Sequence, residues 1–308
     1  MFEIYQKTLS KSVSFEGIGL HSGESAVIKL LPADEDNGIV FKRIDLKKNN
    51  LIKANFVNVS SAKLCTTLEN NQGVKVSTVE HLLAALYISG IDNAIVEINN
   101  EEVPIMDGSS KDFLNVLKKI DLVDQYKKRK YLKILSRVDL IDNTRKISIE
   151  PNDLSLEINF QLNYENKVIG KQKNIIDFQK DNLDEVSSSR TFCLFEDIEK
   201  IKKSGLAKGG SLKNALVVDK DKVLNDGGLR NNKEFVNHKI LDLAGDFLLS
   251  GYRIIGKVIC HQGGHELTNL FLKKLLKSKS AFSITEFNSL SELEKENPSQ
   301  LVQVAVNA

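Results

Sequence analysis

Alternation between apolar and polar residues dominates the first sixty positions of the chain. β-branched and aromatic residues recur there between turn signals such as Asp36-Asn37-Gly38, a pattern that is typical of short strands. We expect three strands, at residues 13–20, 26–32 and 39–46. The chain therefore opens with a β-sheet.

After the predicted strands, the spacing of apolar residues changes to the period of a helix, about 3.6 residues. Apolar residues at helical spacing fill residues 77–89, and Gly90 is a helix-ending residue. A short alternating run at 94–98 predicts a strand, and residues 110–120 predict a second helix. Strands followed by helices favour an α+β layer.

A charged run at residues 124–130 lacks apolar periodicity and predicts a domain boundary near residue 126. The same order of sheet and then helices follows in the second half, so we expect an α+β fold with two similarly built domains, residues 1–126 and 127–308. The elements expected in the second half are strands at 131–141, 146–151, 156–164 and 253–261 and helices at 234–250 and 265–277. Residues 289–308 are poorly patterned, which predicts a loosely held tail.

Composition narrows the class of protein. The 308 residues carry 43 Lys plus Arg against 41 Asp plus Glu, and 41% are hydrophobic, as in a globular protein with a substantial core. The balance of charge argues against a nucleic-acid partner. No apolar run is long enough for a transmembrane segment, and residues 1–12 lack the apolar core of a signal peptide, so we expect a cytoplasmic protein. Three widely spaced cysteines predict reduced thiols.

Glu80 and His81 open the helix expected at 77–89, and a carboxylate beside an imidazole suits the activation of water. Two structural explanations compete with that one. His81 could be a satisfied core histidine, and Ser77 with Glu80 fits a capping box, in which each side chain accepts from a free amide at the helix start.

His238 and Asp242 lie one turn apart in the helix expected at 234–250, so their side chains share a face. Asp246 continues this polar stripe opposite the apolar side of the helix. The stripe could be a solvated surface. Together with His81, it also offers two His and one Asp, a donor set that suits an open zinc site.

His261 and His265 have the same spacing, but Gly263 and Gly264 between them argue against a continuous helix and a shared metal. We interpret His265 as a residue at the start of the helix expected at 265–277. Its imidazole suits proton transfer, although a surface position explains it equally well.

An apolar patch follows residues 188–191 and precedes several glycines. It could be ordinary core and loop. It could also be a flexible insert that lines a passage for a long hydrocarbon, with the Thr191 hydroxyl as a donor at its mouth. The glycines and lysines at 208–214 lack the spacing of a phosphate-binding P-loop, so we discount an ATPase.

Taken together and in this order, several motifs resemble one known family. They are GIGLHSG, STVEHLLAAL, GIDNAIVEI with VPIMDGS, SSRTF, NDGGLR, HKILDLAGD and GGHELTN, and they cover about residues 8–277. The chain resembles the zinc-dependent UDP-3-O-acyl-N-acetylglucosamine deacetylases of lipid A biosynthesis. That resemblance implies two α+β domains with the active site between them.

The resemblance also implies roles for individual residues. His81, His238 and Asp242 are expected to hold one zinc ion, with Fe²⁺ as a possible substitute in the cell. Glu80 would activate water, Thr191 would stabilise the oxyanion, and a cationic His265 oriented by Asp246 would protonate the departing nitrogen. Substrate contacts are expected from Lys239 to the diphosphate, from Phe192 to the sugar ring, and from Phe195, Ile198 and Leu212 along an acyl passage.

The expected substrate is therefore an amphiphilic UDP-sugar, and we expect a monomer that contacts the membrane surface at most transiently. Two other classes remain open at this point. One is a zinc amidohydrolase that acts on a different N-acylated sugar or peptide. The other is a metal-free protein that binds a nucleotide sugar without catalysis.

Overall fold

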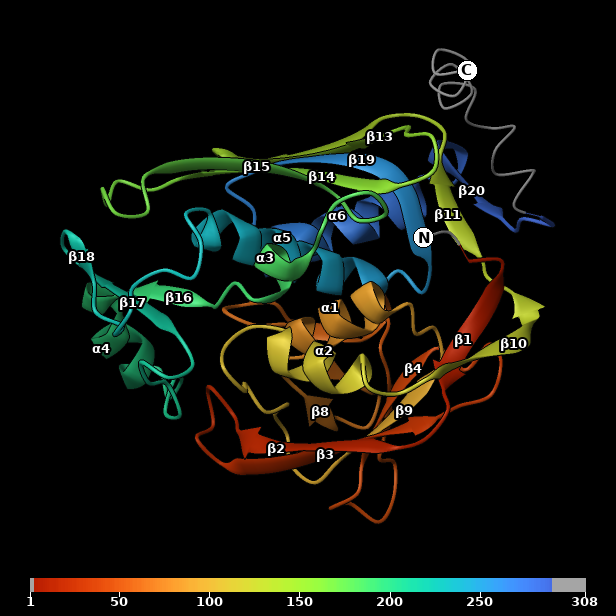
Figure 1. Ribbon diagram of the computed structural model, residues 1–308, viewed down its shortest axis with the longest axis horizontal. Coiled ribbons are helices and arrows are strands. Elements are labelled where there is room, and N and C mark those ends of the chain that lie inside the picture. Colours follow the sequence, from red (N-terminus) through yellow and green to blue (C-terminus); the bar gives the residue numbers. More distant parts are fainter. Residues whose placement is uncertain (1–2, 290–308) are drawn as a thin grey trace, which may run out of the picture.

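Two β-sheets enclose a layer of helices in the computed structural model, which describes residues 3–289 (Figure 1). The predicted α+β fold class is confirmed. Its helices are α1 (Glu80–Ser89), α2 (Lys111–Leu117), α3 (Asp184–Ser187), α4 (Phe195–Lys203), α5 (Glu234–Leu248) and α6 (His265–Lys277), with 3₁₀ turns at η1 (Phe56–Asn58) and η2 (Lys279–Ala281). Within the described part of the chain, no helix has the length and apolar character needed to cross a membrane.

The first sheet is built from the N-terminal third of the chain. Its strands in spatial order are β2 (Val13–Ile18), β3 (Ser25–Pro32), β9 (Ala94–Ile98), β4 (Ile39–Arg43) and β5 (Leu51–Lys53). β4 and β9 are parallel, and the other neighbours are antiparallel. Burial alternates along β3, as expected for a sheet with one face on the core and one on solvent. Helices α1 and α2 lie over the core face (Figure 1).

The second sheet lies on the opposite side of the helices. One run has the order β12 (Val138–Asp142), β13 (Arg145–Glu150), β19 (Arg253–His261), β11 (Tyr131–Ile134) and β20 (Phe282–Thr285). β19 also pairs in parallel with β14 (Leu156–Asn163), which pairs with β15 (Lys171–Asp177). α5 packs against β14 and β15, and α6 packs against β12 and β13.

Three small sheets complete the fold of residues 3–289. They are β1 (Tyr5–Leu9) with β10 (Leu122–Lys128); β6 (Val59–Ser61), β7 (Thr67–Glu69) and β8 (Lys75–Val76); and β16 (Phe192–Leu194), β17 (Leu216–Asp219) and β18 (Lys222–Val223). The last sheet and α4 form residues 192–224, hereafter the insert. In Figure 1 the insert stands beside the layered body, at the end of the helices where α5 begins.

Two details differ from the sequence expectations. The charged run at 124–130 largely forms β10, because pairing with β1 leaves its charged side chains at the surface. The strand expected at 131–141 is two strands, β11 and β12, which lie in different places in the second sheet. The predicted domain boundary at residue 126 falls inside β10, and the division into two domains stays a prediction. The predicted tail lies, from residue 290 onward, outside the described residues.

Candidate metal centre and active site

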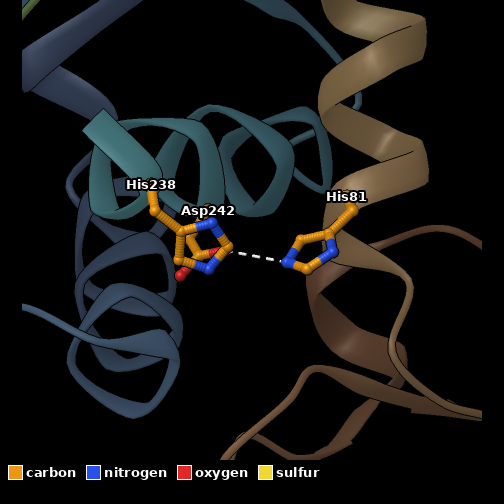
Figure 2. A group of neighbouring side chains, drawn as sticks. All are labelled: His81, His238 and Asp242. Atoms are coloured by element: carbon orange, nitrogen blue, oxygen red, sulfur yellow. Dashed lines mark ion pairs between the residues drawn. The ribbon is translucent and has the colours of Figure 1, made fainter. Parts of the chain in front are cut away.

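Three potential metal ligands meet where α1 packs against α5. His81 is the second residue of α1, and His238 and Asp242 lie one turn apart on α5. Their ligand atoms lie within 4.8 Å of one another, and the two His Nε2 atoms are each 3.4 Å from Asp242 Oδ1. Figure 2 shows the two imidazoles approaching the carboxylate from different helices. The polar stripe of α5 is therefore not a solvated surface: His238 is only 1% exposed and Asp242 only 4%.

The arrangement of these atoms fits a metal ion. Zinc bonds of about 2.0–2.2 Å in a tetrahedron place neighbouring ligand atoms about 3.3–3.6 Å apart, and the two separations of 3.4 Å between the His nitrogens and Asp242 Oδ1 fall in that range. Asp242 Oδ1 is buried and has no hydrogen-bond partner among residues 3–289. A buried carboxylate oxygen without a donor is costly, and a cation between the three side chains would remove that cost.

The orientation of His238 is set by the backbone of a distant segment. Its Nδ1 lies 3.1 Å from the carbonyl oxygen of Ser189, which can only accept a hydrogen bond. Nδ1 therefore carries the proton and donates it, and the Nε2 lone pair faces Asp242, as metal ligation requires. Burial lowers the pKa of His238 to about 3, so the imidazole is neutral.

Lys239 forms an ion pair with Asp242, the third candidate ligand. Its Nζ donates to Asp242 Oδ2 at 2.9 Å. Burial disfavours ionisation of Asp242, but the charges of its neighbours outweigh burial and hold the pKa of Asp242 well below its ordinary value. Asp242 is thus an anion that offers its other oxygen to a cation.

Gly245 allows the two helices to approach closely enough to share these ligands. A Cβ added at Gly245 would lie 2.1 Å from the carbonyl oxygen of Glu80, far inside van der Waals contact. The backbones of α1 and α5 therefore touch at the position directly before His81. Only glycine fits this position, and the side chains of the two helices can converge because of it.

A second cluster lies beside the metal ligands and contains Glu80, Asp246 and His265. His265, the first residue of α6, places Nδ1 2.8 Å from Asp246 Oδ2 and Nε2 3.6 Å from Glu80 Oε1. All three side chains are buried, so neither Asp246 nor His265 is a surface residue.

The capping box considered for Glu80 does not form. Val79 is the N-cap residue of α1, and no side chain caps the helix there. Ser77 is held in a bridge to Glu102, and its hydroxyl donates to the carbonyl oxygen of Glu101. Glu80 Oε2 accepts instead from the backbone N–H of Thr66. The carboxylate therefore faces the cluster rather than its own helix.

Electrostatic interactions in this cluster give Glu80 and His265 different protonation roles. Burial raises the pKa of Glu80. Burial alone would lower the pKa of His265, but the carboxylates of Asp246 and Glu80 outweigh it and raise that pKa to about 10. His265 is therefore a cation that can donate a proton, next to a carboxylate that can accept one.

Thr191 stands at the entrance to the cluster, and a buried ion pair holds its segment. Glu234, the first residue of α5, accepts from the N–H and guanidinium of Arg190, with Nε at 2.7 Å from Oε1. The Thr191 N–H donates to the carbonyl oxygen of Gly108 at 2.8 Å. The same segment supplies the Ser189 carbonyl that orients His238. The ion pair between Arg190 and Glu234, hereafter the anchor, therefore helps to position both the candidate donor Thr191 and the candidate ligand His238.

Two cavities share Thr191 and Phe192 in their linings, and His265 of the cluster lines one of them. A cavity of about 370 Å³ is mainly apolar and is lined by Phe195, Ile198 and Leu212 of the insert. The other, of about 380 Å³, is lined by Lys239 and His265. All of the substrate-contact residues expected from the sequence therefore line one cavity or the other.

Several residues near the site were not recognised in the sequence. Thr66 and Ser189 bond to candidate functional side chains, and Glu234 pairs with Arg190 beside Thr191. Tyr164 and Arg145 line the cavity that holds Lys239. Ser189 is 49 positions from His238, and Thr66 is 14 positions from Glu80 and 180 from Asp246, so no local spacing singles these residues out. Of these residues, only Ser189 lies in one of the family-like motifs, SSRTF.

The chain matches a protein-family model described as UDP-3-O-acyl N-acetylglycosamine deacetylase over residues 6–277. Three similar proteins, each named UDP-3-O-acyl-N-acetylglucosamine deacetylase, come from Geotalea uraniireducens, Saccharophagus degradans and Pseudoalteromonas translucida. The first is 40% identical over 98% of this chain and 98% of its own. The second is 41% identical over 92% and 94%, and the third is 39% identical over 93% and 95%. On this evidence the chain belongs to the UDP-3-O-acyl N-acetylglycosamine deacetylase family.

Proposed function

We propose that this protein hydrolyses the N-acetyl group of UDP-3-O-acyl-N-acetylglucosamine and releases acetate, as a step of lipid A biosynthesis. The observation that carries the proposal is a three-ligand cluster at the α1–α5 contact beside a buried base on α1, Glu80, and a buried acid on α6, His265. The names of the similar proteins support the same substrate.

His81, His238 and Asp242 are the residues that would hold the metal, which we propose to be Zn²⁺, with Fe²⁺ as a substitute in the cell. Bound there, the metal supplies a Lewis acid that polarises the acetamide carbonyl and acidifies water. Three protein ligands leave a position for the reacting molecules, as in hydrolytic sites rather than structural ones.

The side chains around this centre divide the remaining work. Glu80 takes the proton of the attacking water, since burial keeps its carboxylate basic. The Thr191 hydroxyl donates to the carbonyl oxygen as negative charge develops there. His265 donates its Nε2 proton to the departing nitrogen, and Asp246 orients the ring through Nδ1. The amide C–N bond then breaks to give acetate and a free amine.

Substrate binding is assigned to the two cavities. Lys239 lines the cavity with mixed polarity and is proposed to face the diphosphate or nearby substrate oxygens while it holds Asp242. Phe192, whose ring lies 5.5 Å from the Lys239 ammonium, is proposed to pack on the sugar. The apolar cavity along Phe195, Ile198 and Leu212 suits the 3-O-acyl chain.

We also propose that the protein works in the cytoplasm as a monomer and touches the membrane surface transiently at the insert. Phe195 and Leu212 are half-exposed at the apolar cavity, and no ion pair involves Lys202, Lys208 or Lys213 within residues 3–289. Apolar side chains flanked by lysines suit an anionic lipid surface. Sedimentation with anionic and neutral vesicles tests this contact, which equal binding to both would contradict.

The division into two domains, residues 1–126 and 127–308, is retained as part of the proposal. α2 packs against β2 of the first sheet, while α5 and α6 pack against the second. The metal ligands come from both sides of that division, so the site would lie between the domains.

Acetate release from UDP-3-O-acyl-N-acetylglucosamine by metal-loaded protein tests the proposed function. We expect turnover that disappears on chelation and falls by a factor of about 100 or more in Glu80→Gln. Glu157→Gln on β14, outside the site, is the matched control and should keep the wild-type rate. A metal-loaded protein without turnover would point to another N-acylated substrate, and failure to bind metal would point to a binding protein without catalysis.

A further inference from the structure

Thr66 lies between the two carboxylates of the catalytic cluster and bonds to both. Its backbone N–H donates to Glu80 Oε2 at 3.0 Å, and its hydroxyl donates to Asp246 Oδ1 at 2.7 Å. The side chain is only 2% exposed. These contacts join a loop before β7 to α1 and α5, so Thr66 connects the elements that carry the proposed base and the proposed orienting residue.

The contacts of Thr66 complement those of His265. Each carboxylate directs one oxygen at Thr66 and the other at the imidazole: Glu80 Oε1 is 3.6 Å from His265 Nε2, and Asp246 Oδ2 is 2.8 Å from Nδ1. Thr66, Glu80, His265 and Asp246 therefore form a closed ring of interactions. In such a ring, the direction of each carboxylate is fixed at both of its oxygens.

The start of α1 is tied to the same residue. The carbonyl oxygen of Thr66 accepts from the N–H of Val79, the N-cap residue of α1, at 3.4 Å. The Thr66 peptide thus contacts both the helix start and the side chain of Glu80. Its hydroxyl is the part of the residue that reaches the other helix.

We propose that Thr66 is a positioning residue for the deacetylation, an inference that rests on the proposed function. Its hydroxyl holds Asp246 so that His265 presents Nε2 toward the departing nitrogen, and its N–H holds Glu80 for proton transfer. In these contacts Thr66 bonds to Glu80, Asp246 and Val79 and to none of the three candidate metal ligands. Its loss should therefore reduce the chemical step and leave metal binding intact.

The two functional groups of Thr66 can be separated by substitution. Thr66→Val preserves the shape and the backbone N–H but removes the hydroxyl, so Asp246 Oδ1 loses a buried donor and can rotate away from His265. Thr66→Ser keeps the hydroxyl and removes a methyl group. Thr66→Ala also lacks the hydroxyl and adds no bulk, and it serves if the valine variant does not fold.

Steady-state acetate release and metal content are measured for these variants. We expect kcat of Thr66→Val and Thr66→Ala to fall by about 10- to 100-fold with KM within about twofold. Thr66→Ser should regain most of the rate, and all three should keep the metal. Thr8→Val on β1 is the control, because it removes a buried 2.8 Å hydrogen bond from the Thr8 hydroxyl to the carbonyl oxygen of Asn93. It should change stability alone.

A double-mutant cycle with Asp246→Ala tests whether Thr66 acts through Asp246. In that background Thr66→Val should cause little further loss of kcat. A wild-type rate in Thr66→Val, no rescue by serine, or full additivity in the cycle would each overturn the inference while the deacetylase function stands. If the wild-type protein releases no acetate, the proposed function fails, and the inference fails with it.

Discussion

The α1–α5 contact and the insert are built on opposite principles. At the contact, two helices touch backbone to backbone at Gly245, and every ligand and proton carrier is buried. In the insert, α4 has no buried residue, Phe195 is 53% exposed and Leu212 is 47% exposed. The rigid α1–α5 contact suits catalysis, because reacting groups must be held at fixed distances. The exposed apolar insert suits the binding of a flexible acyl chain, which requires apolar surface but less precise positioning.

Gly245→Ala should break the helical contact and produce the largest effect. The added methyl group would lie 2.1 Å from the Glu80 carbonyl oxygen, so the helices must separate. We expect about 3 kcal/mol or more of lost stability and a much weaker metal site, because the ligands sit on both helices. Thermal unfolding and metal content measure both effects.

Gly17→Ala is the matched control for that substitution. Its Cβ would meet the side chain of Pro104 at 3.1 Å, and Gly17 lies on β2, away from the site. We expect a change in stability within about 1 kcal/mol and unchanged metal content. Equal effects at the two glycines would show that the close approach of α1 and α5 is not what holds the metal centre together.

Glu234→Gln should weaken the link between the two regions. The fully buried carboxylate pairs with Arg190, next to Thr191, where the rigid core leads into the insert. Loss of its charge leaves a buried guanidinium uncompensated, and we expect about 3 kcal/mol of lost stability together with slower turnover. Denaturant unfolding and acetate release measure the outcome, and a variant with wild-type values of both would contradict this account of the anchor.

The pH dependence of stability should distinguish the two regions in metal-free protein. The pKa of His265 is raised from an ordinary 6.5 to about 10, so its charge interactions stabilise the fold fully below pH 6.5. That contribution is lost as the pH rises toward 10, by an amount on the order of 2 kcal/mol or more. His265→Gln should flatten the curve between pH 7 and 10, whereas Phe195→Ala should keep the wild-type slope. Parallel curves for wild type and His265→Gln would contradict the assignment.

Local patterns in the sequence correctly predicted features that depend on neighbouring residues, such as the bounds of a helix and the side chains that share one of its faces. α6 begins and ends where its apolar periodicity indicates, and the one-turn spacing of His238 and Asp242 places both on one face. The bond between Thr66 and Asp246 joins residues 180 positions apart, and no spacing records it. The capping box failed for a similar reason, because the bridge between Ser77 and Glu102 withdrew the serine from its helix. Contacts between distant segments determine both details, and the local periodicity of the sequence carries no information about such contacts.

Phe195→Ala should have the smallest effect on the fold and a selective effect on function. The ring is half-exposed, so its loss should cost about 0.5 kcal/mol or less. It lines the apolar cavity, however, and truncation removes surface that a long acyl chain would cover. We expect KM to rise several-fold for a long-chain substrate and little for a short-chain one, since each buried methylene contributes about 0.8 kcal/mol.

Leu270→Ala on α6, 47% exposed and outside both cavities, controls for the loss of an exposed apolar side chain. If Phe195→Ala lowered kcat equally for both chain lengths, the insert would share in positioning the reacting groups, and the separation between rigid chemistry and adaptable binding would no longer hold.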